Sequence, residues 1–310
     1  MEDSLKKLND LIGNIEKVII GKIDNIKYLI VGLLTNGHIL MEDVPGVGKT
    51  MLSLSLAKSI GAGFTRIQFT PDLLPSDVTG GHIYNPKTGD FDLKKGPVFT
   101  NILLADEINR TNPRTQSSLL ECMQEYKVTL DGKTFPLLKP FMVVATQNPI
   151  EFQGTYPLPE AQIDRFLMKV SMGYVSQEGE MAVLKGQKSA HPVDSIEPVL
   201  TIEEVIMLQT KAQEVEVSEK ILAYIVKMVS ATRKNKNVEI GASPRASIAL
   251  MNAARAWALL ENRNYVIPDD VYRLVFPVLR HRLVLKAKAS VSGVTPKTVI
   301  TSIVDETSIK

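Results

Sequence analysis

The sequence predicts an α/β fold in which a parallel sheet is sandwiched between helices and followed by a smaller helical domain. Short apolar runs alternate with helical patterns through the first half of the chain, as they do in proteins with parallel sheets. A glycine-rich turn joins the first apolar run to a helix, and after about Val175 the strand-like runs disappear. We therefore expect an α/β domain at residues 1–175 and an all-helical domain at residues 176–310.

The first half is expected to begin with two helices, because apolar residues recur every three or four positions from Leu5 to about Asn36. The pattern breaks at Ile19-Ile20-Gly21, which separates the two helices. Apolar runs then predict strands at residues 39–41, 65–69, 102–105 and 141–145, and a helical pattern covers residues 115–126. In the second half, helical spacing predicts helices at residues 202–215, 218–233, 244–262 and 268–285.

Two insertions interrupt the α/β pattern. Residues 70–98 are rich in proline and glycine and contain a predicted hairpin turn at residues 86–89. Residues 128–135 predict a second hairpin around Asp131-Gly132, a dipeptide that favours a tight turn between strands. Both hairpins are expected to move or to contact other molecules, and passive surface loops are the alternative.

The composition is that of an ordinary globular protein, with 44% hydrophobic and 23% charged residues. A net charge of +2 gives no chain-wide attraction to nucleic acid or to an anionic membrane, and the apolar stretch at residues 28–34 is too short to span one. The single cysteine, Cys122, lies in an apolar stripe and is expected to be a core residue. A single cysteine cannot form an internal disulfide, and the amino terminus lacks a secretory signal pattern, so the sequence predicts a cytoplasmic protein.

Residues 43–50, Asp-Val-Pro-Gly-Val-Gly-Lys-Thr, are typical of a loop that binds the phosphates of ATP or GTP. Gly46 and Gly48 allow the backbone N–H groups to point inward, where the amino end of the next helix adds its partial positive charge. Lys49 is expected to contact the β and γ phosphates, and the Thr50 hydroxyl to ligate Mg²⁺. The pattern has one departure, since Asp43 stands where the full motif has glycine.

Polar residues follow two of the predicted strands and should meet at one edge of the sheet. Asp106 and Glu107 end the strand at residues 102–105, and Asp106 is expected to hold the Mg²⁺ shell while Glu107 accepts a proton from the attacking water. Asn148 follows the strand at residues 141–145 and could orient that water, although an asparagine before proline is equally typical of a plain turn.

Two arginines stand near predicted helix ends, and phosphoryl transfer needs positive charge near the γ-phosphate. They are Arg165, in Asp164-Arg165-Phe166, and Arg245, in Ser243-Pro244-Arg245. The four histidines show no ligand spacing, so Mg²⁺ bound with the nucleotide is the only metal expected.

The order and spacing of these motifs resemble those of AAA+ ATPases, and their wording is similar to the MoxR family over nearly the whole chain. The blocks that carry the resemblance are residues 42–50, 69–77, 104–110, 145–149, 155–162, 164–167 and 241–245. The resemblance implies an AAA+ nucleotide-binding domain followed by a helical lid. It also explains Asp43, which is common at this position in the family.

The resemblance assigns a role to each candidate residue. Adenine would pack at Ile19, Ile20 and Gly21, and the phosphates would lie against Pro45, Gly46, Val47, Gly48, Lys49, Thr50 and Met51. Asp106 and Glu107 correspond to Walker B, Asn148 to sensor 1 and Arg245 to sensor 2. Arg165 is ranked first as the arginine finger offered to a neighbouring subunit, and Arg110 is its rival.

The resemblance also implies partners. MoxR-like proteins are expected to form a homo-oligomer, a hexamer with ATP, and to act as chaperones in the maturation of protein complexes, including metal or cofactor insertion. The client is expected to be a protein, with a von Willebrand A domain protein as one candidate, and the two hairpins are expected to grip it. A nucleic-acid-dependent ring motor or regulator is the alternative, disfavoured by the near-zero net charge. A third hypothesis is a nucleotide-switched scaffold that hydrolyses little ATP, and the presence of the proton acceptor Glu107 disfavours it.

Overall fold

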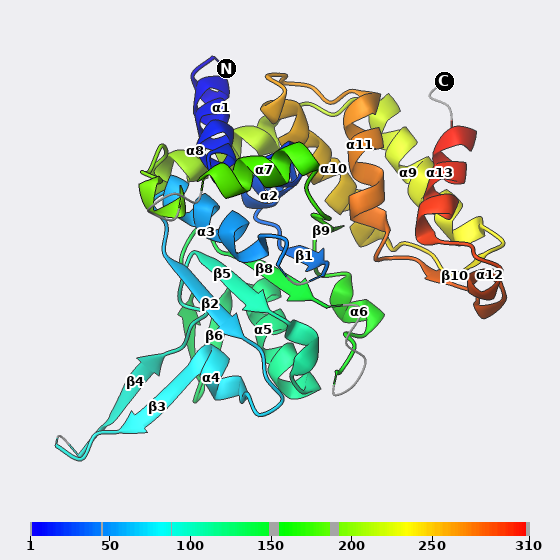
Figure 1. The fold of residues 1–310 in the computed structure, drawn as a ribbon. Coiled ribbons are helices and arrows are strands. Elements are labelled where there is room, and N and C mark those ends of the chain that lie inside the picture. Colours follow the sequence, from blue (N-terminus) through cyan, green and yellow to red (C-terminus); the bar gives the residue numbers. More distant parts are fainter. Residues whose placement is uncertain (1, 45, 88, 149–154, 187–191, 308–310) are drawn as a thin grey trace.

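The computed structural model describes residues 2–44, 46–87, 89–148, 155–186 and 192–307. A sheet with helices on both faces forms one part of the molecule, and a group of helices packs beside its upper layer (Figure 1). Both parts confirm the predicted fold class. The proposed division after residue 175 stays a prediction.

The central sheet has five strands, all parallel, as predicted. Its order is β2-β5-β8-β1-β9. The strands are β1 Ile39–Glu42, β2 Phe64–Gln68, β5 Ile102–Asp106, β8 Met142–Gln147 and β9 Met168–Val170. Because all five run the same way, the ends of β1, β2, β5 and β8 meet along one edge. The three-residue strand β9 was not predicted.

Side chains on the central strands alternate between two hydrophobic clusters. The first core cluster contains Ile102 and Leu104 of β5 and lies against α1, α2, α3 and the helices of the second half. The second core cluster contains Leu103 and Ala105 of the same strand and lies against α5 and the two hairpins. The three central strands β1, β5 and β8 therefore bury both faces, which explains their apolar sequences, whereas the edge strand β2 leaves Arg66 and Gln68 exposed.

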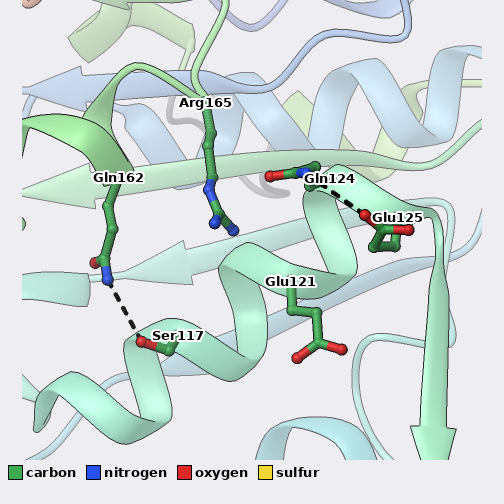
Figure 2. Close-up of a pocket in the computed structure, with 6 residues that line it drawn as sticks. All are labelled: Ser117, Glu121, Gln124, Glu125, Gln162 and Arg165. Carbon is green, nitrogen blue, oxygen red and sulfur yellow. Dashed lines mark hydrogen bonds between the residues drawn. The ribbon is translucent and has the colours of Figure 1, made fainter.

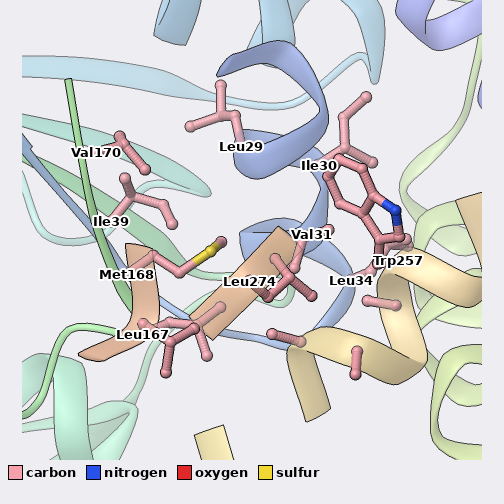
Figure 3. Close-up of a cluster of buried hydrophobic side chains, with 14 of the residues drawn as sticks. Leu29, Ile30, Val31, Leu34, Ile39, Leu167, Met168, Val170, Trp257 and Leu274 are labelled. Carbon is pink, nitrogen blue, oxygen red and sulfur yellow. The ribbon is translucent and has the colours of Figure 1, made fainter. Parts of the chain in front are cut away.

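Thirteen α-helices surround these clusters in the described part of the chain. Their bounds are α1 Glu2–Glu16, α2 Ile23–Leu34, α3 Lys49–Ser59, α4 Pro75–Thr79, α5 Pro113–Glu125, α6 Glu160–Ile163, α7 Gln177–Gly186, α8 Ile202–Glu214, α9 Glu219–Lys234, α10 Pro244–Leu260, α11 Pro268–Leu279, α12 Ala287–Val291 and α13 Pro296–Glu306. Trp257 of α10 packs beside Ile30 and Leu34 of α2, which joins the helical half to the first core cluster (Figure 3). Within the described residues, each helix is too short or too polar to cross a membrane.

Both predicted hairpins are present. The first is β3 Gly80–Tyr84 with β4 Phe91–Lys95, and the second is β6 Lys127–Leu130 with β7 Lys133–Pro136. They touch each other through His82, whose Nδ1 lies 2.5 Å from a carboxylate oxygen of Asp131. Cys122 is buried in the second core cluster as predicted, and burial raises the pKa of its thiol to about 12.

The second half departs from the all-helical prediction in one place. A short antiparallel pair, β10 Val238–Ile240 and β11 Val284–Leu285, lies at its far end. The helix predicted at residues 268–285 accordingly stops at Leu279. Just beyond the helix, Arg282 donates hydrogen bonds to the backbone oxygens of Phe166 and Leu167, and the following residues Val284 and Leu285 pair with β10.

Candidate nucleotide-binding site

The glycine-rich loop connects β1 to α3, as its sequence predicts. Gly46 and Gly48 have φ values of +83° and +93°, a region in which a side chain is strained. Lys49 is the first residue of α3, and its Nζ donates to the backbone oxygen of Asp43 over 3.0 Å. The amino end of α3 thus faces the loop and favours an anion there.

A cavity of about 380 Å³ brings the predicted phosphate-side residues together. Its lining includes residues from the glycine-rich loop, from the end of β5 and from the end of β8. They are Gly46, Gly48, Lys49, Thr50, Met51, Asp106, Glu107 and Asn148. Asn148 is buried, with 6% of its surface exposed. Pro45, also predicted here, lies outside the described residues.

Arg66 and Gln68 also line this cavity and were missed from the sequence. Arg66 Nη2 lies 2.6 Å from an oxygen of Asp106, and Gln68 Nε2 donates to Glu107 over 2.7 Å. Both side chains come from β2, whose register sets Gln68 beside Asp106. Their spacing of two residues places them on one face of the strand, and this was the one available signal.

The two carboxylates have different surroundings. Asp106 accepts a hydrogen bond from the Thr146 hydroxyl over 2.6 Å and pairs with Arg66. Glu107 has a φ of +56°, and its carboxylate accepts from Gln68 and from Arg110 Nη1 at 2.9 Å. In this arrangement both acidic groups are held by side chains of the protein, and a ligand must take over those contacts.

The donor set fits a nucleotide-bound Mg²⁺. The Thr50 hydroxyl and the Asp106 carboxylate are hard oxygen donors that line the same cavity, and Mg²⁺ is commonly held by one or two such groups together with phosphates and waters. Within the described ranges, no cluster of three or more His, Cys, Asp or Glu side chains is arranged to hold a metal ion. Phosphate oxygens would therefore have to complete the coordination.

A second cavity, of about 490 Å³, adjoins the first on the other side of the loop. Most of the residues predicted to surround the base and the loop line it: Ile19, Ile20, Gly46, Val47, Gly48 and Met51. Gly21 does not line it but forms the adjoining turn, with a φ of +70°. The opposite wall was not predicted and consists of residues 172–175 with Glu180 and Val183 of α7.

The two predicted arginines lie outside both cavities. Figure 2 shows the Arg165 side chain reaching from the segment after α6 toward α5, where its Nη1 donates to the backbone oxygen of Leu120 over 2.7 Å. It lines a separate surface pocket with Glu121 and Glu125. Arg245 is exposed on the first turn of α10, two residues after the Ser243 cap.

The sequence and the fold are similar to those of known AAA proteins. A profile of the ATPase family associated with various cellular activities (AAA) matches residues 38–168, and one of the AAA lid domain matches residues 230–303. The chain is 53% identical to the uncharacterized protein YeaC of Bacillus subtilis, over 97% of this chain and 94% of YeaC. It is 44% identical to Chaperone MoxR1 of Mycobacterium tuberculosis, over 94% of this chain and 80% of MoxR1. A crystal structure from Cytophaga hutchinsonii superimposes with a TM-score of 0.92 at 41% identity, over 100% of this chain and 97% of that one.

Proposed function

The chain belongs to the MoxR family of AAA+ ATPases, and from this we propose that it hydrolyses ATP to ADP and phosphate in a cytoplasmic hexameric ring and uses the reaction to remodel client proteins. The observation that supports ATP hydrolysis most directly is the phosphate-side cavity. It gathers Lys49 and Thr50 from the start of α3 and Asp106 and Glu107 from the end of β5 at one edge of the sheet. These are the residue types that bind, charge-neutralise and hydrolyse a γ-phosphate.

Each residue would have a distinct task. Lys49 would exchange the Asp43 carbonyl for phosphate oxygens, while Thr50 and Asp106 would hold the ion. Bound Mg²⁺ supplies charge neutralisation of the β and γ phosphates. Glu107 would accept the proton of the attacking water once its hydrogen bond from Gln68 is broken. Asn148 would fix the position of that water.

We propose Arg165 as the residue that completes a neighbouring subunit's site. Its side chain lies against α5, outside its own nucleotide cavities, which suits a role across a subunit boundary. Arg110, the rival, donates to Glu107 of its own chain. Arg245 would act on its own chain's nucleotide from the lid, since it stands on α10 of the helical half.

The two hairpins are the proposed contact with a client. The Tyr84 and Phe91 rings lie near the tip of the first hairpin with centroids 5.5 Å apart and planes tilted by 59°, and Phe91 is 67% exposed. Exposed aromatic side chains of this kind mark protein contacts. One relative carries the name chaperone. We extend this to maturation of protein complexes, including metal or cofactor insertion, with a von Willebrand A domain protein as a candidate client.

Two variants test the enzymatic part of the proposal. Lys49→Ala should abolish ATP binding or turnover, whereas Arg165→Ala should bind ATP normally and hydrolyse it at least about a thousandfold more slowly. Phosphate release and ATP affinity are measured on the same samples, with Arg110→Ala as the matched arginine control. Normal turnover by Arg165→Ala together with slow turnover by Arg110→Ala would reassign the trans role to Arg110.

A trapping experiment tests the client. Glu107→Gln keeps the side-chain volume but removes the base, so it should bind ATP and stall. It is used as bait with ATP, against Lys49→Ala as the control. A protein retained only by Glu107→Gln supports remodelling. Nuclease-sensitive nucleic acid retained instead would favour the ring motor on nucleic acid.

A further inference from the structure

We infer that Asp43 is a positioning residue that fixes the wall of the base pocket against the phosphate loop. This inference rests on the proposed ATP site and concerns the residue at which the loop departs from the common motif. Asp43 is the first residue after β1 and is only 8% exposed. It does not line either nucleotide cavity. Any effect on nucleotide must therefore pass through the groups that it holds.

The Asp43 carboxylate binds a segment far away in the chain. Its Oδ2 accepts from the backbone N–H groups of Met172 at 2.5 Å and Gly173 at 2.7 Å, and from the Ser171 hydroxyl at 3.0 Å. Its Oδ1 accepts from the N–H of Val44 at 3.0 Å. The contact is possible because β1 and β9 are neighbouring parallel strands, so the chain leaves both at the same edge. A carboxylate with several N–H donors forms strong, charge-assisted hydrogen bonds.

The turn held by Asp43 is also held from its other side. Lys22 Nζ donates to the backbone oxygens of Met172 at 2.5 Å and Tyr174 at 2.7 Å. Met172, Gly173 and Tyr174 form the wall of the 490 Å³ cavity that faces the phosphate loop. Asp43 and Lys22 therefore clamp one turn of backbone, and the width of the base pocket depends on that clamp.

Glycine at position 43 would leave this clamp open. It has no side-chain acceptor, so the buried N–H of Met172 would lose its partner, at the cost of a buried unpaired donor. The glycine-rich cradle itself would keep its two left-handed glycines and Lys49. Losing Asp43 should thus weaken binding of the base and leave phosphate binding nearly unchanged.

Calorimetric titration with Mg²⁺ and three probes separates these effects: ATP, ADP and inorganic tripolyphosphate, which has no base. Asp43→Gly should lower affinity for ATP and ADP at least about fivefold, and Asp43→Asn, which keeps one acceptor oxygen but loses the charge, should lower both by a smaller factor; tripolyphosphate affinity should stay within about twofold of the wild type in both. Ser171→Ala is the matched control, because it removes one weaker donor and keeps both backbone contacts. It should change all three affinities less than about twofold.

Lys22→Met tests the same wall without altering the loop, in case the Asp43 variants fold poorly. It should show the same selective loss for ATP and ADP. Equal loss of tripolyphosphate affinity in the Asp43 variants, or unchanged ATP affinity, overturns the inference. Failure of the wild type to bind ATP would instead overturn the proposed function, and loss of all three probes in Lys49→Ala distinguishes the two cases.

Discussion

Replacing Asp164 with Asn removes the carboxylate that pairs with the buried guanidinium of Arg282. Arg282 Nε donates to Asp164 Oδ1 over 2.6 Å, and only 2% of the arginine side chain is exposed. The rest of the guanidinium donates to backbone oxygens, including those of Phe166 and Leu167. The pair ties the end of α11 to the segment that carries Arg165. Asn at position 164 keeps the shape of the contact and removes its charge.

The expected cost follows from leaving a buried charge without its partner. Burial lowers the pKa of Arg282, and the hydrogen bond to Asp164 opposes that shift, so the carboxylate helps keep the buried arginine charged. Breaking a buried pair by removing one partner costs about 3–5 kcal/mol. Asp164 is 21% exposed at its side chain and Asn retains an acceptor. We therefore expect the lower end, about 3 kcal/mol of unfolding free energy.

Urea unfolding followed by circular dichroism measures this difference. Ser243→Ala is the matched control, because it removes only the 3.2 Å hydrogen bond from the Ser243 hydroxyl to Asp164 and should cost about 1 kcal/mol. Equal slopes in urea would show that the unfolding reaction is the same in each variant. A loss below about 1 kcal/mol in Asp164→Asn would refute the reasoning, since it would mean that water screens the pair.

Two further predictions concern pH and magnesium. Burial lowers the pKa of His38 to about 4, so the folded chain keeps the ring neutral while the unfolded chain protonates below its value of 6.5. The free energy of unfolding should therefore decrease as pH falls from 6.5 toward 4, by about 2 kcal/mol between pH 7 and pH 5 in urea titrations. A smaller decrease in His38→Asn would support His38 as the cause, and an equal decrease would contradict it. Arg66→Ala frees Asp106 of a half-exposed pair worth about 1 kcal/mol or less, so the Mg²⁺ concentration for half-maximal ATP binding should fall by up to about fivefold. A higher Mg²⁺ requirement would mean that Arg66 binds phosphate instead.

The sheet and the placement of the phosphate loop could be predicted because they depend on local patterns. Apolar runs such as residues 102–105 identify strands buried on both faces, and the two glycines with Lys49 identify a phosphate cradle. The parallel direction then follows from the alternation with helices. Because β5 and β8 are parallel, Asp106 and Asn148 lie at the same edge of the sheet.

The remaining features depend on contacts between distant segments. Asp43 meets Met172 and Gly173 about 130 positions away along the chain, and nothing in the local sequence specifies those partners. Arg66 lies near Asp106 only because of the register between β2 and β5, which the local sequence around Arg66 does not specify. The strands β10 and β11 have only three and two residues, too few for a detectable period.

The alternation of side chains along β5 has a consequence for how this protein can diversify. The helical half packs on the first core cluster, whereas Val78 and Val98 at the base of the first hairpin and Val128 of the second belong to the second. The strands of the central sheet separate the two core clusters. Substitutions in the hairpins should therefore perturb the second core cluster and leave the packing around the base pocket, in the first core cluster, unchanged. If the hairpins hold the client as proposed, a change of client would leave the nucleotide site unaltered.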